Sequence, residues 1–312
     1  TKSSYNRPPT NNPDRQFRAL FADSPDGHRI ATWVNYAPHA TVLGSANSDA
    51  TGDWTAWAPQ EIERLYGGVG MGTVGALGAM DWNKPEGDND AREAEARQRI
   101  RDMVAAATAA RQPVHGDELG VELSFVHEPL MQPFLLLNYV PRIAPGPLGL
   151  SIQRSVTPPW NTALVGTYAG AARIGDVFVS AFPGEPFPEL HYQLREGGVT
   201  GAQANFLLGA ANDFLGYMLR TNEQYQQAFT EGALYLGGCP EEEVISGLGG
   251  DPDGACPDHW TLMVSPTIGR HMVCTIQDAA DRLGFGSAAR DSECAVLTAL
   301  DGIAAPAEIA AP

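Results

Sequence analysis

Short apolar runs separated by glycine and proline recur along the whole chain, and this pattern constrains the fold more than any other feature of the sequence. The 312 residues include 34 glycines and 24 prolines, so turns and loops must be frequent. Between these breaks, runs typical of strands alternate with runs whose apolar residues recur at helical spacing. Such interleaving is typical of α/β proteins. We therefore expect an α/β fold, with a mixed β-sheet core and flanking helices.

Several of these strands and helices can be placed along the chain. Residues 18–36 have the pattern of a β-hairpin around a Ser-Pro-Asp-Gly turn. Asp53 precedes an expected helix over residues 54–66 as its N-cap. Asp88 and Asn89 are candidate caps of a second helix over residues 90–111. The other expected elements are strands over residues 174–182 and 206–211 and a helix over residues 186–195.

The apolar run from Val69 to Met80 is distinguished by its glycines, which stand at positions 70, 72, 75 and 78. Glycine inside a strand often marks a place where another backbone comes very near. We expect a strand and a tight turn here, packed closely against another part of the protein.

The net charge of the chain limits the classes of partner that it can bind. There are 20 Lys and Arg against 37 Asp and Glu, a formal net charge of −17, and no basic cluster. Such a chain repels phosphate backbones and anionic lipid headgroups, so we expect no nucleic-acid partner. Its longest apolar stretches, such as residues 133–140, are well below the ~20 residues of a spanning helix, so we expect no transmembrane segment.

All four cysteines lie in the last quarter of the chain, and none belongs to a Cys-x-x-Cys pair. We expect structural disulfides, which would place the protein outside the cell or on the exterior of the cell envelope. Sequence order suggests the pairs Cys239–Cys256 and Cys274–Cys294, although four cysteines allow three pairings.

Three residues that can bind a metal follow expected strands. These are His39, Glu185 in a Pro-Gly-Glu turn, and Tyr217. Functional residues collect at strand ends in α/β sheets, and imidazole, carboxylate and phenolate groups can all bind zinc. Each also has a structural interpretation, as a hydrogen-bonded histidine, a turn and a packing tyrosine. His127, which ends another expected strand, is a reserve ligand.

The order and surroundings of these residues resemble the neutral/alkaline ceramidase family, zinc-dependent amidases that cleave N-acyl-sphingosine. The segment Asn35-Tyr-Ala-Pro-His39-Ala-Thr is similar to the one in which the family's histidine binds zinc. Pro-Gly-Glu185 matches the family's carboxylate ligand, and the segment that ends at Tyr217 resembles the one whose last tyrosine is a ligand. The resemblance runs from about Asn6 to Gly237 and implies zinc as the cofactor.

The resemblance implies roles for three more residues. Asn6-Arg7-Pro-Pro is similar to a family segment whose arginine lies at the active site, so Arg7 inherits that role. Asp53 stands 14 positions after His39, where family members also have an aspartate. Asp81 occupies the place of a family serine, where a carboxylate could accept a proton, bind a substrate amine, or simply form a turn.

Two departures from the family shape the expected domain organisation. Family members carry another zinc-binding histidine upstream of the segment matched here, so either a separate N-terminal chain of the same precursor supplies it, or His127 or another residue substitutes. The cysteine-containing end does not resemble the family's C-terminal immunoglobulin-like domain. We expect residues 1–237 to be the C-terminal part of a ceramidase-like catalytic domain, and residues 238–312 to be an extension packed on it.

The leading functional hypothesis is a zinc-dependent hydrolase that cleaves the amide bond of a lipid-like N-acyl substrate, with metal-bound hydroxide as the nucleophile. Arg7 or Tyr217 would stabilise the oxyanion, and Asp81 or Asp53 would handle a proton. Two alternatives stay open. The chain starts at Thr1 without a signal peptide, which suggests proteolytic processing and a possible N-terminal threonine nucleophile. The missing serine and upstream histidine also allow a non-catalytic secreted scaffold.

Overall fold

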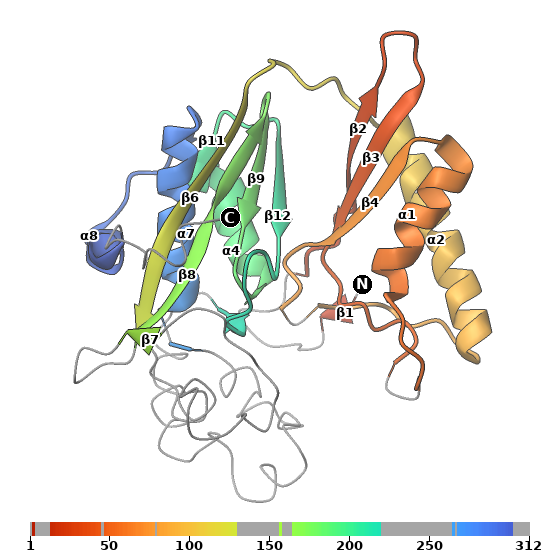
Figure 1. Ribbon diagram of the computed structural model, residues 1–312, viewed down its shortest axis with the longest axis horizontal. Helices are drawn as coiled ribbons and strands as arrows, with labels where there is room; N and C mark the ends of the chain where they lie inside the picture. The colour runs from red at the N-terminus through yellow and green to blue at the C-terminus, as the bar shows by residue number, and fades with distance from the viewer. Residues whose placement is uncertain are drawn as a thin grey trace, which may run out of the picture.

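In the computed structural model, two β-sheets lie face to face between layers of helices (Figure 1). Interleaved strands and helices therefore form the mixed α/β fold that the sequence predicts. The structure describes residues 2–3, 13–44, 47–78, 80–129, 156–157, 164–219, 264–265 and 267–301.

The small sheet has the strand order β2-β3-β4, formed by Arg18–Asp23, Arg29–Tyr36 and Val69–Val74. The antiparallel pair β2–β3 is the predicted hairpin, and β4 runs parallel to β3. The connection from β3 to β4 contains α1, residues Asp53–Tyr66, which crosses the outer face of this sheet. A strand, a helix and a parallel strand thus follow one another as the alternating pattern indicates.

Helix α2, residues Asn89–Ala109, lies beside α1 and completes the helical layer over the small sheet. Asp88 caps α2 as predicted, because its carboxylate accepts a hydrogen bond of 3.0 Å from the backbone N–H of Ala91. The N-cap of α1 is Gly52 rather than the predicted Asp53, which is the first helical residue. Asp53 has a φ of 52°, so its carboxylate does not cap the helix in the usual way.

The large sheet has the strand order β12-β9-β8-β6. Strand β12 runs parallel to β9, whereas β8 is antiparallel to both of its neighbours, so this sheet is mixed as well. A short strand, β7, pairs with β8. The strands span Leu119–Pro129 for β6, Val156–Thr157 for β7, Leu164–Ile174 for β8, Val177–Ala181 for β9 and Ala204–Leu208 for β12.

Three expected elements are shorter than the sequence pattern indicates. The strand expected over residues 174–182 begins only at Val177, because Gly175 adopts a φ of 57° in a turn between β8 and β9. Helix α4 covers only Pro188–Gln193 and passes into a wider turn over Leu194–Gly198, where Gly197 has a φ of 108°. The strand expected over residues 206–211 is β12, which starts two residues earlier and ends at Leu208.

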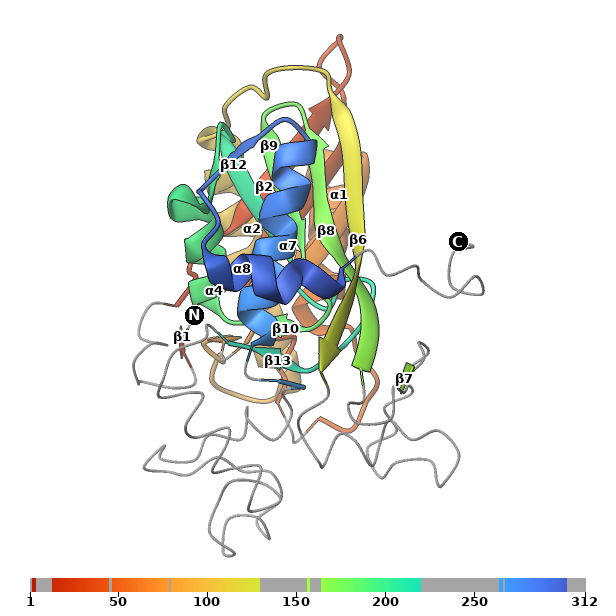
Figure 2. The same cartoon turned by 90° about the vertical axis from the view of Figure 1, so that its left-hand side faces the viewer.

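Helix α7, residues Ile268–Arg282, packs against the large sheet on the face that points away from the small sheet (Figure 2). Its buried side chains join those of α4 and the sheet in the largest apolar cluster of the described residues. No helix among the described residues is long and apolar enough to cross a bilayer. The smaller elements nearby are β11 (Val199–Thr200), β14 (Gly286–Ser287), α8 (Ser292–Leu297) and a 3-10 turn (Thr298–Leu300).

A disulfide joins Cys274 of α7 to Cys294 of α8, as sequence order suggests. The other suggested pair, Cys239–Cys256, lies outside the described residues.

Replacing both Cys274 and Cys294 by alanine is expected to lower the free energy of unfolding by about 3 kcal/mol. The disulfide closes a loop over a sequence separation of 20 residues, and its loss lets the unfolded chain explore more conformations. Urea unfolding of the two proteins measures the difference. Val296→Ala on the same helix, whose side chain is exposed, is the control and should change stability by less than ~0.5 kcal/mol.

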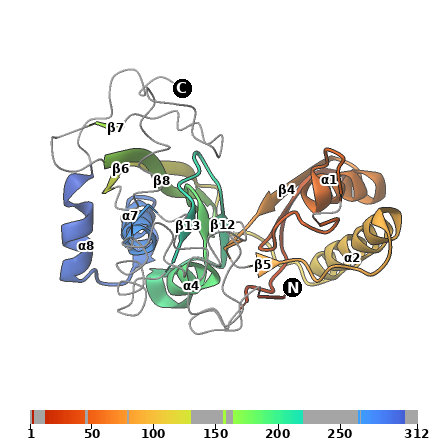
Figure 3. The same cartoon turned by 90° about the horizontal axis from the view of Figure 1, so that it is seen from below.

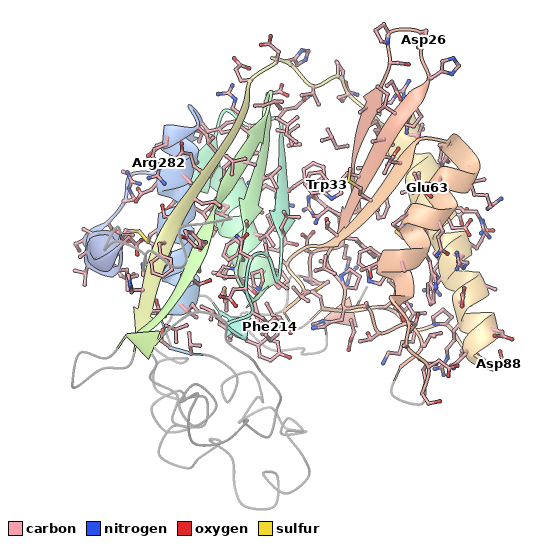
Figure 4. The ribbon with its side chains drawn as sticks, in the orientation of Figure 1. Asp26, Trp33, Glu63, Asp88, Phe214 and Arg282 are labelled. Atoms are coloured by element: carbon pink, nitrogen blue, oxygen red, sulfur yellow. A yellow bond between two sulfur atoms is a disulfide. The ribbon has the colours of Figure 1, made fainter. Side chains whose placement is uncertain are left out.

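The two sheets touch where β12 approaches β3 and β4. The indole of Trp33 stacks on the ring of Phe206 with 4.9 Å between the ring centroids, and Figure 4 shows Trp33 reaching from the small sheet into the space between the sheets. The side-chain amide of Asn35 donates a buried hydrogen bond of 2.8 Å to the carbonyl of Leu207. These contacts set how the ends of the two sheets meet.

Candidate functional site

The predicted metal-binding residues meet at the carboxyl ends of strands from both sheets. His39 follows β3, Glu185 follows β9 and Tyr217 follows β12. Glu185 and Tyr217 are direct neighbours, because β10 (Glu185–Pro186) pairs in parallel with β13 (Tyr217–Met218) in this register. His39 reaches the same place from the small sheet. The structure thus brings together three residues that are far apart in the sequence.

His39 and Glu185 are in direct contact. The Nε2 atom of His39 lies 3.0 Å from Oε2 of Glu185, and its Nδ1 atom lies 2.8 Å from the carbonyl oxygen of Met80. Burial lowers the pKa of His39, but the hydrogen bond to Glu185 and the negative charges of Glu185 and Asp81 outweigh burial and raise the pKa above its usual value. The negative charge of Glu185 therefore favours a cation at this position.

Asp81 lies close to this pair. It forms β5 (Met80–Asp81), and its Oδ1 accepts a hydrogen bond of 3.1 Å from the hydroxyl of Thr41. Thr41 stands two residues after His39, and sequence reasoning gave it no role. The strand β1 (Lys2–Ser3) pairs antiparallel with β5, with Lys2 opposite Asp81. Figure 3 shows the N-terminus beside β5.

Asp53 and Arg7 are placed differently from these residues. The carboxylate of Asp53 is buried and accepts hydrogen bonds from the backbone N–H groups of Leu43, at 3.2 Å, and Trp54, at 2.6 Å. Trp54 in turn donates from its indole to the carbonyl of Pro38 at 3.0 Å. These bonds tie α1 to the two ends of the loop that carries His39. Arg7 lies outside the described residues.

The turn that carries Glu185 is held by the loop after β12. The backbone N–H of Glu185 donates to the carbonyl of Gly216 at 2.8 Å, and Leu215 donates to Pro183 at 2.8 Å. In the same loop Ala210 and Asn212 adopt φ values of 50° and 68°. Non-glycine residues seldom adopt such values, and where they do the surrounding structure must hold them. The Glu185 turn and this loop therefore fix each other.

Gly78 supplies the close approach that the glycine-rich run predicts. A Cβ atom on Gly78 would lie 2.4 Å from the ring of Phe187 and 2.8 Å from the carbonyl oxygen of Glu185. The N–H of Gly78 also donates to the carbonyl of Pro186 at 3.0 Å. The segment that leads to Asp81 thus packs directly on the Glu185 turn. The ring of Phe187 also packs edge-on against Tyr217.

Gly78→Ala is expected to displace the Glu185 turn and to cost about 1–3 kcal/mol of stability, because a buried ring and a backbone oxygen block the added methyl group. Gly75→Ala is the matched control, since its nearest atoms lie at an ordinary contact distance of 3.4 Å. Urea unfolding compares their stabilities. Equal stability for the two variants would contradict the close packing of Gly78 on this turn.

The donor atoms at this site fit a zinc ion in kind, though they do not complete a site by themselves. The backbone carbonyl of Met80 can hold the Nδ1 proton of His39, which leaves Nε2 for a metal, and Glu185 adds a carboxylate beside it. Tyr217 stands next to Glu185 in the register of the neighbouring strand. Within the described part of the chain, no group of three or more His, Cys, Asp and Glu residues could hold a metal.

The reserve ligand His127 lies at the carboxyl end of β6, two strands away from β9. Its side chain is buried, and its ring packs edge-on against Phe125 with 4.9 Å between the centroids. Among the residues that the structure describes, its Nδ1 atom has no hydrogen-bond partner.

No protein-family profile matches the sequence, and no curated protein sequence is similar to it. Solved structures do match. Neutral ceramidase from Pseudomonas aeruginosa superposes with a TM-score of 0.50 at 17% identity, covering 90% of this chain. A ceramidase complexed with C2 gives a TM-score of 0.52 at 16% identity over the same share of this chain.

The fold is ceramidase-like. This likeness bears on the fold alone, because the sequence identities are low. The chain also spans only about half the length of the matched ceramidases, 49% and 51% respectively. The likeness therefore assigns no activity to this protein.

Proposed function

We propose that the protein is a zinc-dependent hydrolase that cleaves the amide bond of a lipid-like N-acyl substrate. The observation that carries the proposal is the 3.0 Å contact between His39 and Glu185 at the strand ends of a ceramidase-like fold. Tyr217 stands beside Glu185 and Asp81 beside His39. The matched structures bear the name ceramidase, which makes an amide of a lipid the substrate class to test.

His39, Glu185 and Tyr217 would hold the zinc ion. The ion, when bound, supplies Lewis-acid activation of the amide carbonyl and of water. The carbonyl of Met80 fixes the orientation of the His39 ring, because it accepts from Nδ1 and so directs Nε2 toward Glu185. A further ligand would come from the companion N-terminal chain of the same precursor or from His127.

Asp81 is placed to take a proton from the attacking water or to bind the amine of the substrate. The hydroxyl of Thr41 donates to one oxygen of its carboxylate and so helps to orient the carboxylate for this task. Arg7 and Tyr217 would stabilise the negative charge that develops on the carbonyl oxygen. Asp53 supports the site from a distance, since its hydrogen bonds to Leu43 and Trp54 hold the loop after His39.

The disulfide between Cys274 and Cys294 supports a location outside the cytosol. Disulfides persist in oxidising compartments and are rare where thiols are kept reduced. We propose that the protein is secreted or faces the exterior of the cell envelope.

Elemental analysis of the purified protein, together with intact mass and assays on N-acyl lipids, tests the function. We expect one zinc ion per active protein, loss of amide hydrolysis after chelation, and recovery with zinc. A metal-free, fully active protein would overturn the proposal. Thr1→Ala should leave activity unchanged. Loss of activity in this variant would favour Thr1 as the nucleophile. Bound zinc without turnover of any N-acyl substrate would favour the scaffold.

A further inference from the structure

The segment that leads into β2, residues 13–17, lies against helix α4, whose apolar side chains pack on the large sheet. Nδ1 of His191 lies 2.9 Å from Oδ2 of Asp14, and both residues are fully buried. The hydroxyl of the neighbouring Tyr192 donates to the carbonyl of Pro13 at 3.1 Å. These contacts join one end of the small sheet to the layer of the large sheet. We call the four residues Pro13, Asp14, His191 and Tyr192 the clamp.

Asp14 accepts four hydrogen bonds in the clamp. Besides the bond from His191, the guanidinium of Arg18 donates to both carboxylate oxygens, at 3.0 and 3.2 Å, and the backbone N–H of Gln16 donates at 3.1 Å. Burial raises the pKa of Asp14, but the hydrogen bonds from His191 and Arg18 and the charge of Arg18 outweigh burial and hold the pKa well below its usual range. The buried carboxylate is therefore ionised, which strengthens each of these bonds.

A buried ionic network of this kind is better suited to fixing orientation than to adding stability. Two apolar side chains of similar size could join the same elements at equal stability, because taking charges out of water is costly. Hydrogen bonds, by contrast, need their own distances and angles, so the network is satisfied in one arrangement of its partners. The clamp is thus suited to set how the segment before β2 lies relative to α4.

Both sides of the clamp lead directly to the candidate metal ligands. Arg18, the first residue of β2, pairs in register with Asn35 of β3, which stands four residues before His39. On the other side, α4 begins at Pro188, three residues after Glu185. The side chains of His39 and Glu185 belong to different layers and lie 3.0 Å apart. Their distance therefore depends on how the two layers are held together.

We propose that Asp14 and His191 are positioning residues for the candidate metal site: their contact holds the layer that carries Glu185 in place against the small sheet that carries His39. They act through the elements on either side of the clamp and not on the reacting atoms. The effect on zinc rests on the proposed function, whereas the coupling of the two layers does not.

Three variants test this role, and circular dichroism shows whether each is folded. His191→Leu removes the bond from α4 while Arg18 stays paired with Asp14. His191→Asn is the matched control, because its amide N–H can replace Nδ1 as the donor to Asp14. Ile100→Ala is the control for stability, since Ile100 is buried in the apolar cluster of the small-sheet layer and its truncation leaves a destabilising cavity there.

Spin labels on unnatural residues at positions 26 and 282 measure how firmly the layers are held. Asp26 lies in the turn between β2 and β3 and Arg282 ends α7, so the labels report on opposite layers (Figure 4). Pulsed electron spin resonance should give one narrow distance distribution for the wild type, His191→Asn and Ile100→Ala, and a distribution about twice as broad for His191→Leu. If His191→Leu does not fold, Tyr192→Phe, which removes only the bond to Pro13, should show the broadening.

An unchanged distribution in the folded His191→Leu protein, or in Tyr192→Phe where it takes its place, would overturn the proposal. Equal broadening in Ile100→Ala would also overturn it, because general destabilisation would then explain the effect.

Titration of the same proteins with zinc provides the second readout. We expect His191→Leu to raise the Kd for zinc by about tenfold or more, as losses of residues that orient a ligand do, and both controls to stay near the wild type. Unchanged zinc affinity beside a broadened distance distribution would overturn the positioning role at the metal site. A wild-type protein that binds no zinc would contradict the proposed function, and the distance measurement would still decide whether the clamp holds the layers.

Discussion

Replacing Glu185 by glutamine is expected to remove zinc from the protein and to lower kcat/KM for amide hydrolysis by more than ~100-fold. Glutamine keeps the size of the side chain and can still bond the His39 ring, but it lacks the negative charge that favours a cation at this place. The expected loss is large because the proposed zinc ligand itself is replaced, rather than a residue that only orients a ligand. His39→Gln should have the same effect.

Metal content and activity must be measured together with stability. Glu196→Gln is the matched control, since Glu196 is an exposed carboxylate 11 residues further along whose partner is the surface residue Arg195. It should keep full zinc content and activity. Circular dichroism and thermal unfolding show whether Glu185→Gln is folded. A folded Glu185→Gln protein that retains both zinc and activity would contradict a ligand role for Glu185.

Local patterns predict much of this site, because they place residues at strand ends. The strand before His39 and the Pro-Gly-Glu turn at Glu185 are both readable from a few neighbouring residues. The glycine at position 78 also indicates a close contact with another part of the backbone. None of these patterns shows that His39 and Glu185, which are 146 residues apart in the sequence, are in contact. That contact depends on how the two sheets pack on each other.

The sequence cannot show which way buried polar residues point. The sequence predicts that His127 ends a strand, and β6 includes both His127 and the adjacent Glu128. Adjacent strand residues face opposite sides, so only Glu128 meets α7. Asp53 is a similar case: the ceramidase resemblance points to it as a group that handles a proton, and the structure adds that both of its carboxylate oxygens accept backbone hydrogen bonds. In both cases contacts between segments far apart in the sequence determine where the side chain points.

A second buried cluster lies between α7 and the large sheet, and it contains His271. Nδ1 of His271 lies 2.6 Å from Oε2 of Glu128, and Nε2 lies 3.1 Å from Oδ1 of Asp301. Ser265 and Thr267 donate to the other oxygen of Glu128. Burial lowers the pKa of His271, but its hydrogen bonds to Asp301 and Glu128 and their charges outweigh burial and raise it to about 9.

This pKa predicts how stability depends on pH. The folded pKa of His271 lies above the ordinary value of 6.5, so its stabilising contribution is complete below about pH 6.5 and is lost as the pH rises through about 9. The contribution is at most about 3 kcal/mol. Urea unfolding at pH 6, 7.5 and 9.5 should show this fall in stability, because deprotonation of His271 leaves the buried carboxylate of Glu128 and the partly buried carboxylate of Asp301 without a cation.

His271→Leu is expected to lower the free energy of unfolding at pH 6 by about 3–5 kcal/mol, because it leaves the buried Glu128 and the partly buried Asp301 without their shared partner. It should also remove the fall in stability between pH 6.5 and 9.5, since no histidine remains there to titrate. Glu122→Gln on the same strand is the control: its ion pair with Arg282 is partly exposed and should contribute less than about 1 kcal/mol. If the wild type and His271→Leu lost stability in parallel as the pH rises, His271 would not be the titrating group. The expected contrast arises because a surface pair remains solvated when one partner is lost, whereas the carboxylate of Glu128 has no access to water.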